Sequence, residues 1–274
     1  MKIGLGLPIS DPATLLSWAR RADAGPFSTL GLLDRLVFDN PEPLVTLAAL
    51  AGTTRRIRVQ TEVLLAPLRQ TPLLAKQSAT LAQISGDRFT LGIGVGGRED
   101  DFLAAEADIH RRGRLLDAQM AQLHHLWSGA PCSADVGPIG PARRPEVLFG
   151  GFKPAAIDRV GRWGDGFLGA GPLDYAERTF ALAEASWREH GRPGRPRLVG
   201  QVNTAIGPDS VLDQARAEIT RYYGRSYFAD AMATTPASIR AAIARLTSLG
   251  ADEVVLYCWS ADLDQVDRLA DLTA

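Results

Sequence analysis

Two acidic residues and one arginine near the ends of predicted strands have side chains that could polarise a substrate or exchange a proton. Asp34 follows the apolar run 29–33 and precedes Arg35, while Glu62 lies near the end of the alternating run 57–63. Two carboxyl groups can act as general acid and base, although acids at such positions also serve only to hold loops. Arginine stays protonated, so Arg35 suits an anionic ligand better than proton transfer. We treat Asp34, Arg35 and Glu62 as candidate catalytic residues.

A pair of glycines between a predicted strand and a predicted helix could bind a phosphate group. Gly150 and Gly151 are followed by Phe152, Lys153 and a proline that begins the helix. Backbone N–H groups at the start of a helix, with a lysine nearby, favour a bound anion. An ordinary solvated helix start has the same features, so both interpretations stay open. These four residues are candidate cofactor-binding residues.

A second glycine-rich segment, 92–97, formally matches the G-x-G-x-x-G pattern of dinucleotide-binding domains. That pattern needs a helix directly after its third glycine, so that a pyrophosphate meets the helix N-terminus. Here the acidic segment 98–101 follows, and three βα units come before it. We instead interpret Val95, Gly96 and Gly97 as small residues that let a flat ring approach the backbone, with a tight turn as the equal alternative.

Residues that bind metals or perform serine-type hydrolysis form no matching pattern. Cys132 and Cys258 are far apart, and they have neither disulfide-framework nor zinc-ligand spacing. His124 and His125 are adjacent, so on a helix they point about 100° apart and cannot share one metal ion. The chain contains no G-x-S-x-G motif. We expect no metal site.

The composition is that of a soluble globular protein. The chain has 274 residues, of which 46% are hydrophobic and 22% charged, with a formal net charge of -1. This length can bury a full core, and the charge gives no general reason to bind nucleic acid or an anionic membrane. The N-terminus has no charged leader, and no apolar run approaches the ~18 residues of a membrane span. We expect a cytoplasmic protein that binds a small molecule.

Short apolar runs alternate with stretches of helical periodicity, which is typical of βα units that build a parallel sheet. The predicted strands are residues 2–7, 29–33, 57–63, 88–94, 146–149, 165–168, 197–206 and 253–258. After a first helix near residue 12, the predicted helices are residues 41–54, 71–84, 114–127, 154–163, 175–190, 209–223, 236–249 and 263–272. Eight strands with interleaved helices in about 250 residues predict an α/β fold of the (β/α)8 TIM-barrel type. We expect a single domain over residues 1–274, with short insertions.

The barrel prediction also locates the chemistry, because barrel enzymes carry their sites on the loops after the C-terminal ends of the strands. The segments at those ends are 34–35, 62–63, 95–101, 150–153, 170–171 and 203–204. Polar residues elsewhere are expected to be solvated.

Six segments, in this order, are similar to one enzyme family. They are 33–36, 62–69, 75–81, 84–96, 150–151 and 163–167, of which 84–96 is the most specific. The chain resembles the luciferase-like flavin-dependent oxidoreductases, a barrel family that includes bacterial luciferase and enzymes that use the deazaflavin coenzyme F420. The resemblance covers nearly the whole chain.

The resemblance implies a flavin or deazaflavin ring, of FMN or coenzyme F420, across the barrel mouth. It implies that the loops after strands four and five hold the phosphate, with Val95, Gly96 and Gly97 close to the ring. It further implies that Glu62 and Val63 form a platform under the ring and are joined by a non-prolyl cis peptide bond. Family members often pair, so a homodimer is implied as well.

Two positions depart from the family pattern. Arg35 stands where many members carry a proton-transferring histidine, and Gly97 stands where some deazaflavin-dependent members carry a glutamate. The implied activity is hydride transfer, or activation of dioxygen by reduced flavin, on a small organic substrate. The alternatives are a phosphate-binding barrel isomerase or lyase without flavin, and a flavin-binding protein without catalytic activity.

Overall fold

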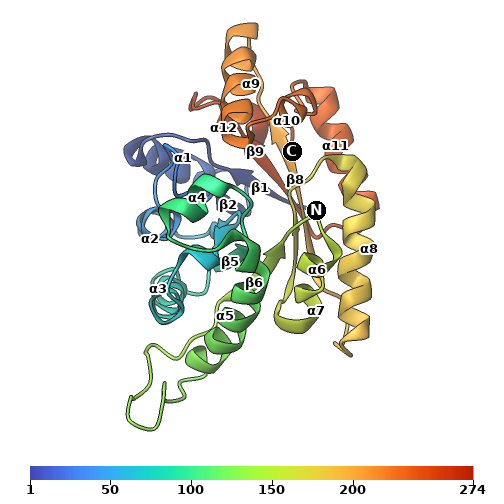
Figure 1. Ribbon diagram of the computed structural model, residues 1–274. Coiled ribbons are helices and arrows are strands. Elements are labelled where there is room, and N and C mark those ends of the chain that lie inside the picture. The colour runs from blue at the N-terminus through green and yellow to red at the C-terminus, as the bar shows by residue number, and fades with distance from the viewer. Residues whose placement is uncertain (274) are drawn as a thin grey trace.

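The computed structural model describes residues 1–273, and parallel strands form a closed barrel at its centre (Figure 1). The strands are β1 (Lys2–Gly6), β2 (Thr29–Leu32), β3 (Arg58–Thr61), β4 (Leu64–Leu65), β5 (Phe89–Gly94), β6 (Glu146–Gly150), β7 (Gly166–Gly169), β8 (Arg197–Thr204) and β9 (Glu253–Cys258). Their order is β3-β2-β1-β9-β8-β7-β6-β5-β4, and a further pairing of β3 with β5 closes the ring. The predicted (β/α)8 barrel is confirmed.

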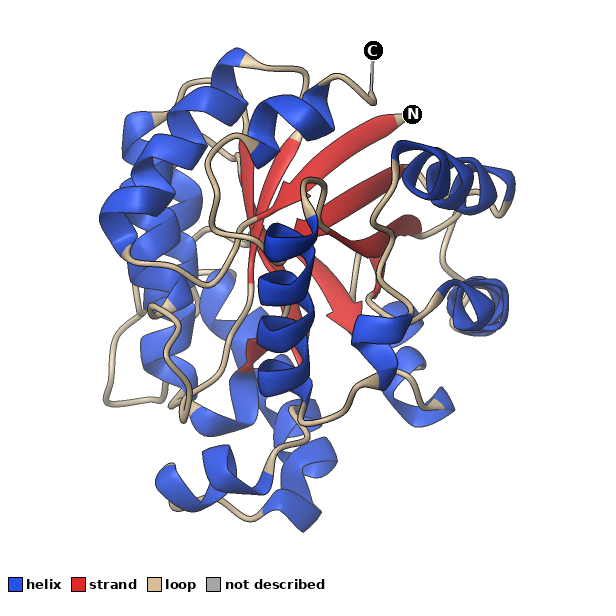
Figure 2. Ribbon diagram, turned by 90° about the horizontal axis from the view of Figure 1, so that it is seen from above, coloured by secondary structure: helices blue, strands red, loops and turns tan. Residues whose placement is uncertain are grey.

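Helices surround the strands, as the view from above shows (Figure 2). They are α1 (Pro12–Ala24), α2 (Pro43–Thr53), α3 (Thr71–Ile84), α4 (Glu99–Ala104), α5 (Arg112–Trp127), α6 (Pro154–Ile157), α7 (Arg159–Trp163), α8 (Leu173–Glu189), α9 (Asp209–Tyr223), α10 (Tyr227–Asp230), α11 (Pro236–Ser248) and α12 (Gln265–Ala270). Two 3-10 helices, η1 (Ala66–Leu68) and η2 (Ile109–Arg111), lie in the connections. The irregular segment after α5 extends away from the barrel (Figure 1).

The third predicted strand is divided in the structure. β3 ends at Thr61, and β4 begins at Leu64, where pairing moves entirely to β5. The peptide bond between Glu62 and Val63 is cis and non-prolyl, as the family resemblance implies. β3 and β4 therefore fill one strand position of the eight-stranded barrel.

Two short helices were not predicted, and one predicted helix is divided. The acidic segment 98–101 forms the beginning of α4, because negative side chains favour the N-terminal turn of a helix. α10 lies between the two predicted helices α9 and α11. The predicted helix 154–163 is α6 and α7, separated at Asp158, whose carbonyl oxygen accepts a hydrogen bond from the Ser186 hydroxyl at 2.8 Å.

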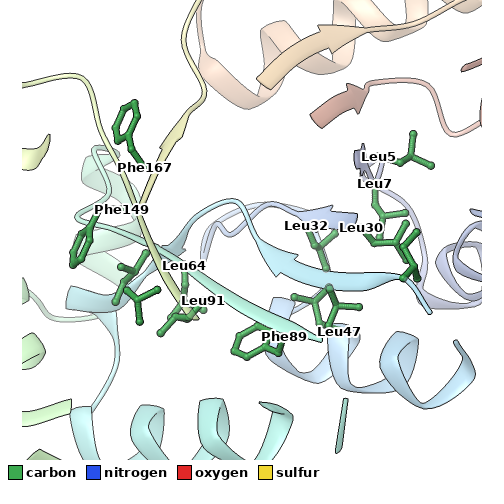
Figure 3. Packing of buried hydrophobic residues seen from close by; sticks show 14 of the residues in the cluster. Leu5, Leu7, Leu30, Leu32, Leu47, Leu64, Phe89, Leu91, Phe149 and Phe167 are labelled. Carbon is green, nitrogen blue, oxygen red and sulfur yellow. The ribbon is translucent and has the colours of Figure 1, made fainter. Parts of the chain in front are cut away.

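The main hydrophobic core lies between the outer face of the barrel and the helices. Leu30 and Leu32 of β2 point outward and belong to one buried cluster with Leu47 of α2 and Phe89 of β5 (Figure 3). Alternate residues of each strand therefore face the helices, while the residues between them face the lumen.

The lumen is filled at its N-terminal end and in its middle. Arg197 forms ion pairs with Glu146 and Glu253, and Arg58 also pairs with Glu146, at 2.9 Å. Above this charged layer, the inward-facing apolar side chains are Leu148, Leu168, Val199 and Val255. Buried side chains therefore occupy the lumen below its C-terminal end.

Candidate active site

The C-terminal ends of the strands form a mouth whose two halves differ in side-chain size. One half, over β4 to β7, is the small-residue half, and its members are Val63, Gly94, Val95, Gly96, Gly97, Gly150, Gly151 and Ala170. The other half is the aromatic half, and its members are Phe38, Tyr222, Tyr223, Phe228, Tyr257 and Trp259. The sequence-predicted cofactor residues lie in or beside the small-residue half.

Val63 is the centre of the small-residue half. A Cβ atom at Gly94 would lie 2.6 Å from Val63 Cγ2, and one at Gly150 would lie 2.8 Å from Val63 Cγ1. Val63 therefore packs directly on the backbone of β5 and β6, where any larger residue would collide with it. The side chain is itself only half-buried, so its upper surface is accessible.

The loop after β5 contains a tight turn at Gly96, which is one of the two interpretations that the sequence leaves open for its glycines. Gly96 has φ +73°, a left-handed conformation that favours glycine. Gly97 is exposed, and a Cβ atom there would have no neighbour within 4 Å. The loop therefore turns tightly and also leaves open space beside the mouth.

The loop after β6 contains the predicted phosphate-binding residues. Gly151 has φ +157°, and Lys153 is exposed directly before α6. Phe152 is 50% exposed and covers Gly171 of the next loop, where a Cβ atom would lie 2.9 Å from the ring. The structure thus places Lys153 at the outer edge of the mouth, in contact with solvent.

The aromatic half closes its side of the mouth. Tyr223 and Phe228 stack with their ring centroids 4.0 Å apart, and Trp259 lies within 6 Å of Tyr222 and Tyr223. Trp259 is only 2% exposed. The small-residue half therefore faces an aromatic wall on the other side of the mouth.

Asp34 is buried and fully engaged with the segment that follows the cis peptide bond. Its carboxylate accepts hydrogen bonds from Arg69 at 2.6 and 3.0 Å and from the backbone N–H of Leu65 at 2.7 Å. Arg69 also contacts Glu42 at 3.1 Å. Asp34 therefore holds β4 in place beside the mouth.

Arg35 is also buried, and its guanidinium is bound within the protein. Its Nε donates to Asp101 at 2.5 Å, and its other nitrogens donate to Asp100 and to the carbonyl oxygen of Tyr222 at 3.0 and 3.2 Å. Asp101 further accepts from the backbone N–H of Val37 at 2.7 Å. Arg35 thus connects the loop after β2 with α4 and α9.

Glu62 differs from Asp34 and Arg35 because it has no oppositely charged partner within residues 1–273. Its Oε1 accepts a hydrogen bond from Gln60 Nε2 at 2.9 Å, and its Oε2 has no partner among the described residues. Burial raises the pKa of Glu62 to about 8, and the nearby charge of Glu253 adds to the rise, against the Gln60 hydrogen bond. Of the three predicted catalytic residues, Glu62 is the one whose side chain has an oxygen, Oε2, without a hydrogen-bond partner among the described residues.

The family of this chain follows from its sequence profile. The profile of a family described as "Luciferase-like monooxygenase" matches residues 3–254. The chain belongs to this luciferase-like family. The match extends from β1 to the start of β9 and confirms the family resemblance.

Curated relatives of this luciferase-like chain include bacterial proteins with and without an assigned activity. An uncharacterized protein of Mycobacterium tuberculosis is 29% identical over 161 residues, which are 55% of this chain and 56% of the relative. The chain thus matches just over half the length of that relative. An F420-dependent glucose-6-phosphate dehydrogenase of Beutenbergia cavernae is 30% identical over 238 residues, 78% of this chain and 69% of the relative.

Solved structures share the fold of the luciferase-like chain at low identity. An F420-dependent secondary alcohol dehydrogenase, in complex with an F420-acetone adduct, has a TM-score of 0.83 at 15% identity and covers 99% of this chain and 97% of its own. An FMN complex of the oxygenating constituent of 3,6-diketocamphane monooxygenase from Pseudomonas putida has a TM-score of 0.72 at 16% identity, with 97% and 96% covered. At these identities the likeness establishes the fold alone.

Asn203 is a mouth residue whose segment was predicted but whose role was not. Its Oδ1 accepts hydrogen bonds from Trp259 Nε1 at 2.9 Å and from Gln201 Nε2 at 3.3 Å. These two bonds fix the orientation of the amide, so its Nδ2 is the group left to donate to a ligand. The position at the end of β8 is a sequence signal, but only the fold brings Trp259 beside it.

The tyrosines of α9 were missed because their helix is far from the strands in sequence. Tyr222 and Tyr223 end α9, whose amphipathic pattern indicates only a packed helix. Burial raises the pKa of both phenols. Nothing in the local pattern indicates that this helix end covers the barrel mouth.

Residues 1–273 contain neither a cluster of metal ligands nor a membrane-spanning helix. No three or more His, Cys, Asp or Glu side chains of these residues are grouped so that they could hold a metal ion. No helix in the same range is long and apolar enough to cross a membrane. Cys258 is buried, and burial raises the pKa of its thiol to about 12.

Proposed function

We propose that the protein is an oxidoreductase that binds FMN or coenzyme F420 and acts on a small organic substrate. The observation that carries this proposal is the small-residue half of the mouth, where Val63 packs on Gly94 and Gly150 and stays partly exposed. A flat ring needs such close access to backbone, and the aromatic half bounds it on the opposite side. Membership of the luciferase-like family supports the same activity.

The residues present fit a ring with a phosphate-bearing tail. Val63, Val95, Gly96 and Gly97 would hold the ring, with Glu62 beneath it, and the loop of Gly150, Gly151, Phe152 and Lys153 would hold the phosphate through N–H groups and one cation. When bound, the cofactor supplies hydride transfer or, as reduced flavin, reaction with dioxygen. The protein contributes orientation, electrostatics and exclusion of water.

Asp34 and Arg35 would act in this proposal by positioning other groups. Asp34 holds the backbone of Leu65, and Arg35 holds α4 through Asp101. Because their polar atoms already have protein partners, neither needs to touch the substrate for the mouth to keep its shape. Proton transfer then falls to Glu62 among the three predicted catalytic residues.

One titration tests the proposal and chooses the cofactor. The purified protein is titrated separately with FMN and with F420 while ligand fluorescence is followed. F420 is named in the Beutenbergia cavernae relative, and FMN in the Pseudomonas putida structure. Saturable binding of one of them is expected, and the preferred ligand separates dehydrogenase from monooxygenase chemistry.

The same titration distinguishes the alternative functions. Absence of binding to both ligands would favour a phosphate-binding isomerase or lyase without flavin. Binding without any oxidation of added reduced cofactor, with or without candidate substrates, would favour a flavin-binding protein that does not catalyse.

We also propose a homodimer located in the cytoplasm. The candidate interface is α2, whose 11 residues carry no charge and whose Val45 is 68% exposed. Light scattering should show a dimer that Val45→Glu dissociates, while Leu103→Glu, at a 77% exposed residue of α4, leaves it intact. A monomeric wild-type protein would contradict the dimer, and cell fractionation tests the location.

A further inference from the structure

The carboxyl group of Glu62 lies inside the barrel, below the small-residue half of the mouth. The residue is 4% exposed. Gly31 of β2 provides the space for it, because a Cβ atom at residue 31 would lie 2.2 Å from Glu62 Oε1 and 2.3 Å from the carboxyl carbon. The barrel wall is therefore shaped around this carboxyl group, and alanine at residue 31 would displace it.

Other acidic groups of the lumen and mouth are paired with arginine. Asp34 pairs with Arg69, and Glu146 pairs with Arg197. Glu62 takes part in no ion pair of the described residues, and its Oε2 lacks a hydrogen-bond partner there. An isolated carboxylate is unfavourable in such a place, whereas a neutral acid has an O–H group that it can donate.

Among residues 1–273, the ionisable groups coupled to Glu62 are two phenols and one carboxyl group, which itself pairs with Arg197. They are the phenols of Tyr223 on α9 and Tyr257 on β9, and the carboxyl group of Glu253 at the start of β9. Burial raises the pKa of both tyrosines, so both phenols are neutral neighbours of Glu62. The amide of Gln60 is the one hydrogen-bond donor to Glu62 among the described residues. Burial and the charge of Glu253 oppose ionisation of Glu62, and the Gln60 hydrogen bond offsets them only in part.

We propose that Glu62 is held as a carboxylic acid and that its Oε2–H donates a hydrogen bond, and in turnover a proton, to an acceptor atom of the ligand in the mouth. The inference rests on the proposed oxidoreductase function. The acceptor is a carbonyl oxygen or a ring nitrogen, supplied by the cofactor ring or by the substrate. Asn203 Nδ2 lies at the same mouth as a second, non-ionisable donor.

For a carbonyl substrate, the hydride comes from the reduced cofactor and the proton comes from Glu62. The carbonyl carbon takes up a hydride from the reduced cofactor, and the C=O π bond breaks. The substrate oxygen takes the proton from Glu62 Oε2, whose O–H bond breaks to leave a carboxylate. Solvent water returns a proton to Glu62, the cofactor leaves oxidised, and the product is an alcohol. The reverse sequence oxidises an alcohol. A substrate class of carbonyls and alcohols follows from this step.

Infrared difference spectroscopy tests the protonation state without any cofactor. The wild-type protein should show the C=O band of a protonated carboxylic acid at pH 6.5, and the band should disappear as the pH rises through about 8. Glu62→Gln should lack this band, whereas Glu189→Gln, at an exposed residue of α8, should retain it. A wild-type spectrum without the band at pH 6.5 would overturn the proposal.

Ligand binding then identifies the acceptor. If the ring is the acceptor, wild-type affinity for FMN or F420 should fall about tenfold per pH unit above pH 8, and Glu62→Gln should be insensitive to pH in this range. If the substrate is the acceptor, ring affinity should be unchanged, and the same pH dependence should appear in kcat/KM for a ketone. Equal pH profiles of wild type and Glu62→Gln in both measurements would overturn the proposal. Failure of both cofactors to bind contradicts the proposed function and leaves the infrared test valid.

A second pair of variants covers the case in which Glu62→Gln does not fold. Gly31→Ala should remove the infrared band or destabilise the protein, because its methyl group occupies the space of the carboxyl group. Gly31→Ala combined with Glu62→Ala should restore the wild-type Tm without restoring the band. A Tm that falls further in the double variant would contradict the packing of Glu62 against Gly31.

Discussion

At the scale of single residues, Asp34, Arg35 and Glu62 are all buried near the mouth, but their hydrogen-bond and ion-pair partners differ. Asp34 has the Arg69 guanidinium and a backbone N–H, Arg35 has two carboxylates, and Glu62 has one neutral amide. Asp34 and Arg35 therefore have oppositely charged partners, while burial without such a partner favours the neutral form of Glu62. Residue type alone predicts the same acid/base role for Asp34 and Glu62.

Glu62 should make the stability of the protein fall with rising pH. Its pKa is about 8 in the folded state against an ordinary 4.5, so unfolding between these values releases a proton. Relative to Glu62→Gln, the wild-type free energy of unfolding should therefore decrease by up to about 1.4 kcal/mol per pH unit from about pH 5 to 7.5. Urea unfolding of both proteins at pH 5.5 and 7.5 measures this difference. A pH-independent difference would show that Glu62 ionises normally.

Lys153 should contribute to cofactor affinity if it contacts the phosphate. Lys153→Ala is expected to raise the Kd of the preferred cofactor about fivefold, which corresponds to ~1 kcal/mol for an exposed charge contact. Fluorescence titration at low and high salt measures it, and salt should reduce the effect. Lys76→Ala, on the exposed face of α3, is the matched control. Equal affinities of both variants would assign Lys153 to the solvated surface.

At the scale of elements, α4 is attached to the barrel mouth through one buried ion pair. Asp101 is fully buried and Arg35 nearly so, and the guanidinium also lies over the rings of Phe38 and Tyr222, at 5.5 and 5.8 Å. α4 has six residues, too few to be stable without tertiary contacts. The position of this helix beside Gly97 therefore depends on Arg35.

Removal of Arg35 should destabilise the protein and release α4. Arg35→Ala leaves the Asp101 carboxylate buried without a cation, and such a change costs about 3 kcal/mol. Chemical unfolding measures the loss, and limited proteolysis should cleave the segment 95–107 faster. Arg98→Ala is the control, since Arg98 is more exposed and meets Asp100 at 3.8 Å, which predicts a loss of at most ~1 kcal/mol. Similar stability of both variants would mean that α4 is held by other contacts.

At the scale of the whole molecule, the two ends of the barrel have different compositions. The N-terminal end contains the ion pairs of Arg58, Glu146, Arg197 and Glu253, and the C-terminal end contains the two halves of the mouth. Burial raises the pKa of Glu146, but Arg197, Arg58 and Thr90 outweigh it, so the pKa is lowered overall. The charged layer fills the N-terminal end of the barrel, and the candidate site lies at the C-terminal end, where barrel enzymes carry their active sites.

Loss of Arg197 should reduce stability without changing ligand affinity. Arg197→Leu leaves the buried carboxyl group of Glu253 and the partly exposed one of Glu146 without this partner, and it is expected to cost about 3 kcal/mol. The Kd of the preferred cofactor should stay within about twofold, because the ion pairs lie at the opposite end of the barrel. Urea unfolding and fluorescence titration measure the two quantities. A parallel loss of affinity would show that the two ends of the barrel are coupled.

The amino-acid sequence by itself determined the order of strands and helices, the barrel and the loops that carry the candidate site. Periodicity and strand ends depend on neighbours in the chain, and the segments from Asp34 to Lys153 were located in this way. The tertiary structure decided which of these groups have partners. Arg69 and Asp101 reach Asp34 and Arg35 from 35 and 66 residues away, and α9 brings Tyr222 and Tyr223 to the mouth. Local sequence patterns cannot predict such contacts, because burial and ion pairing depend on residues that only folding brings together.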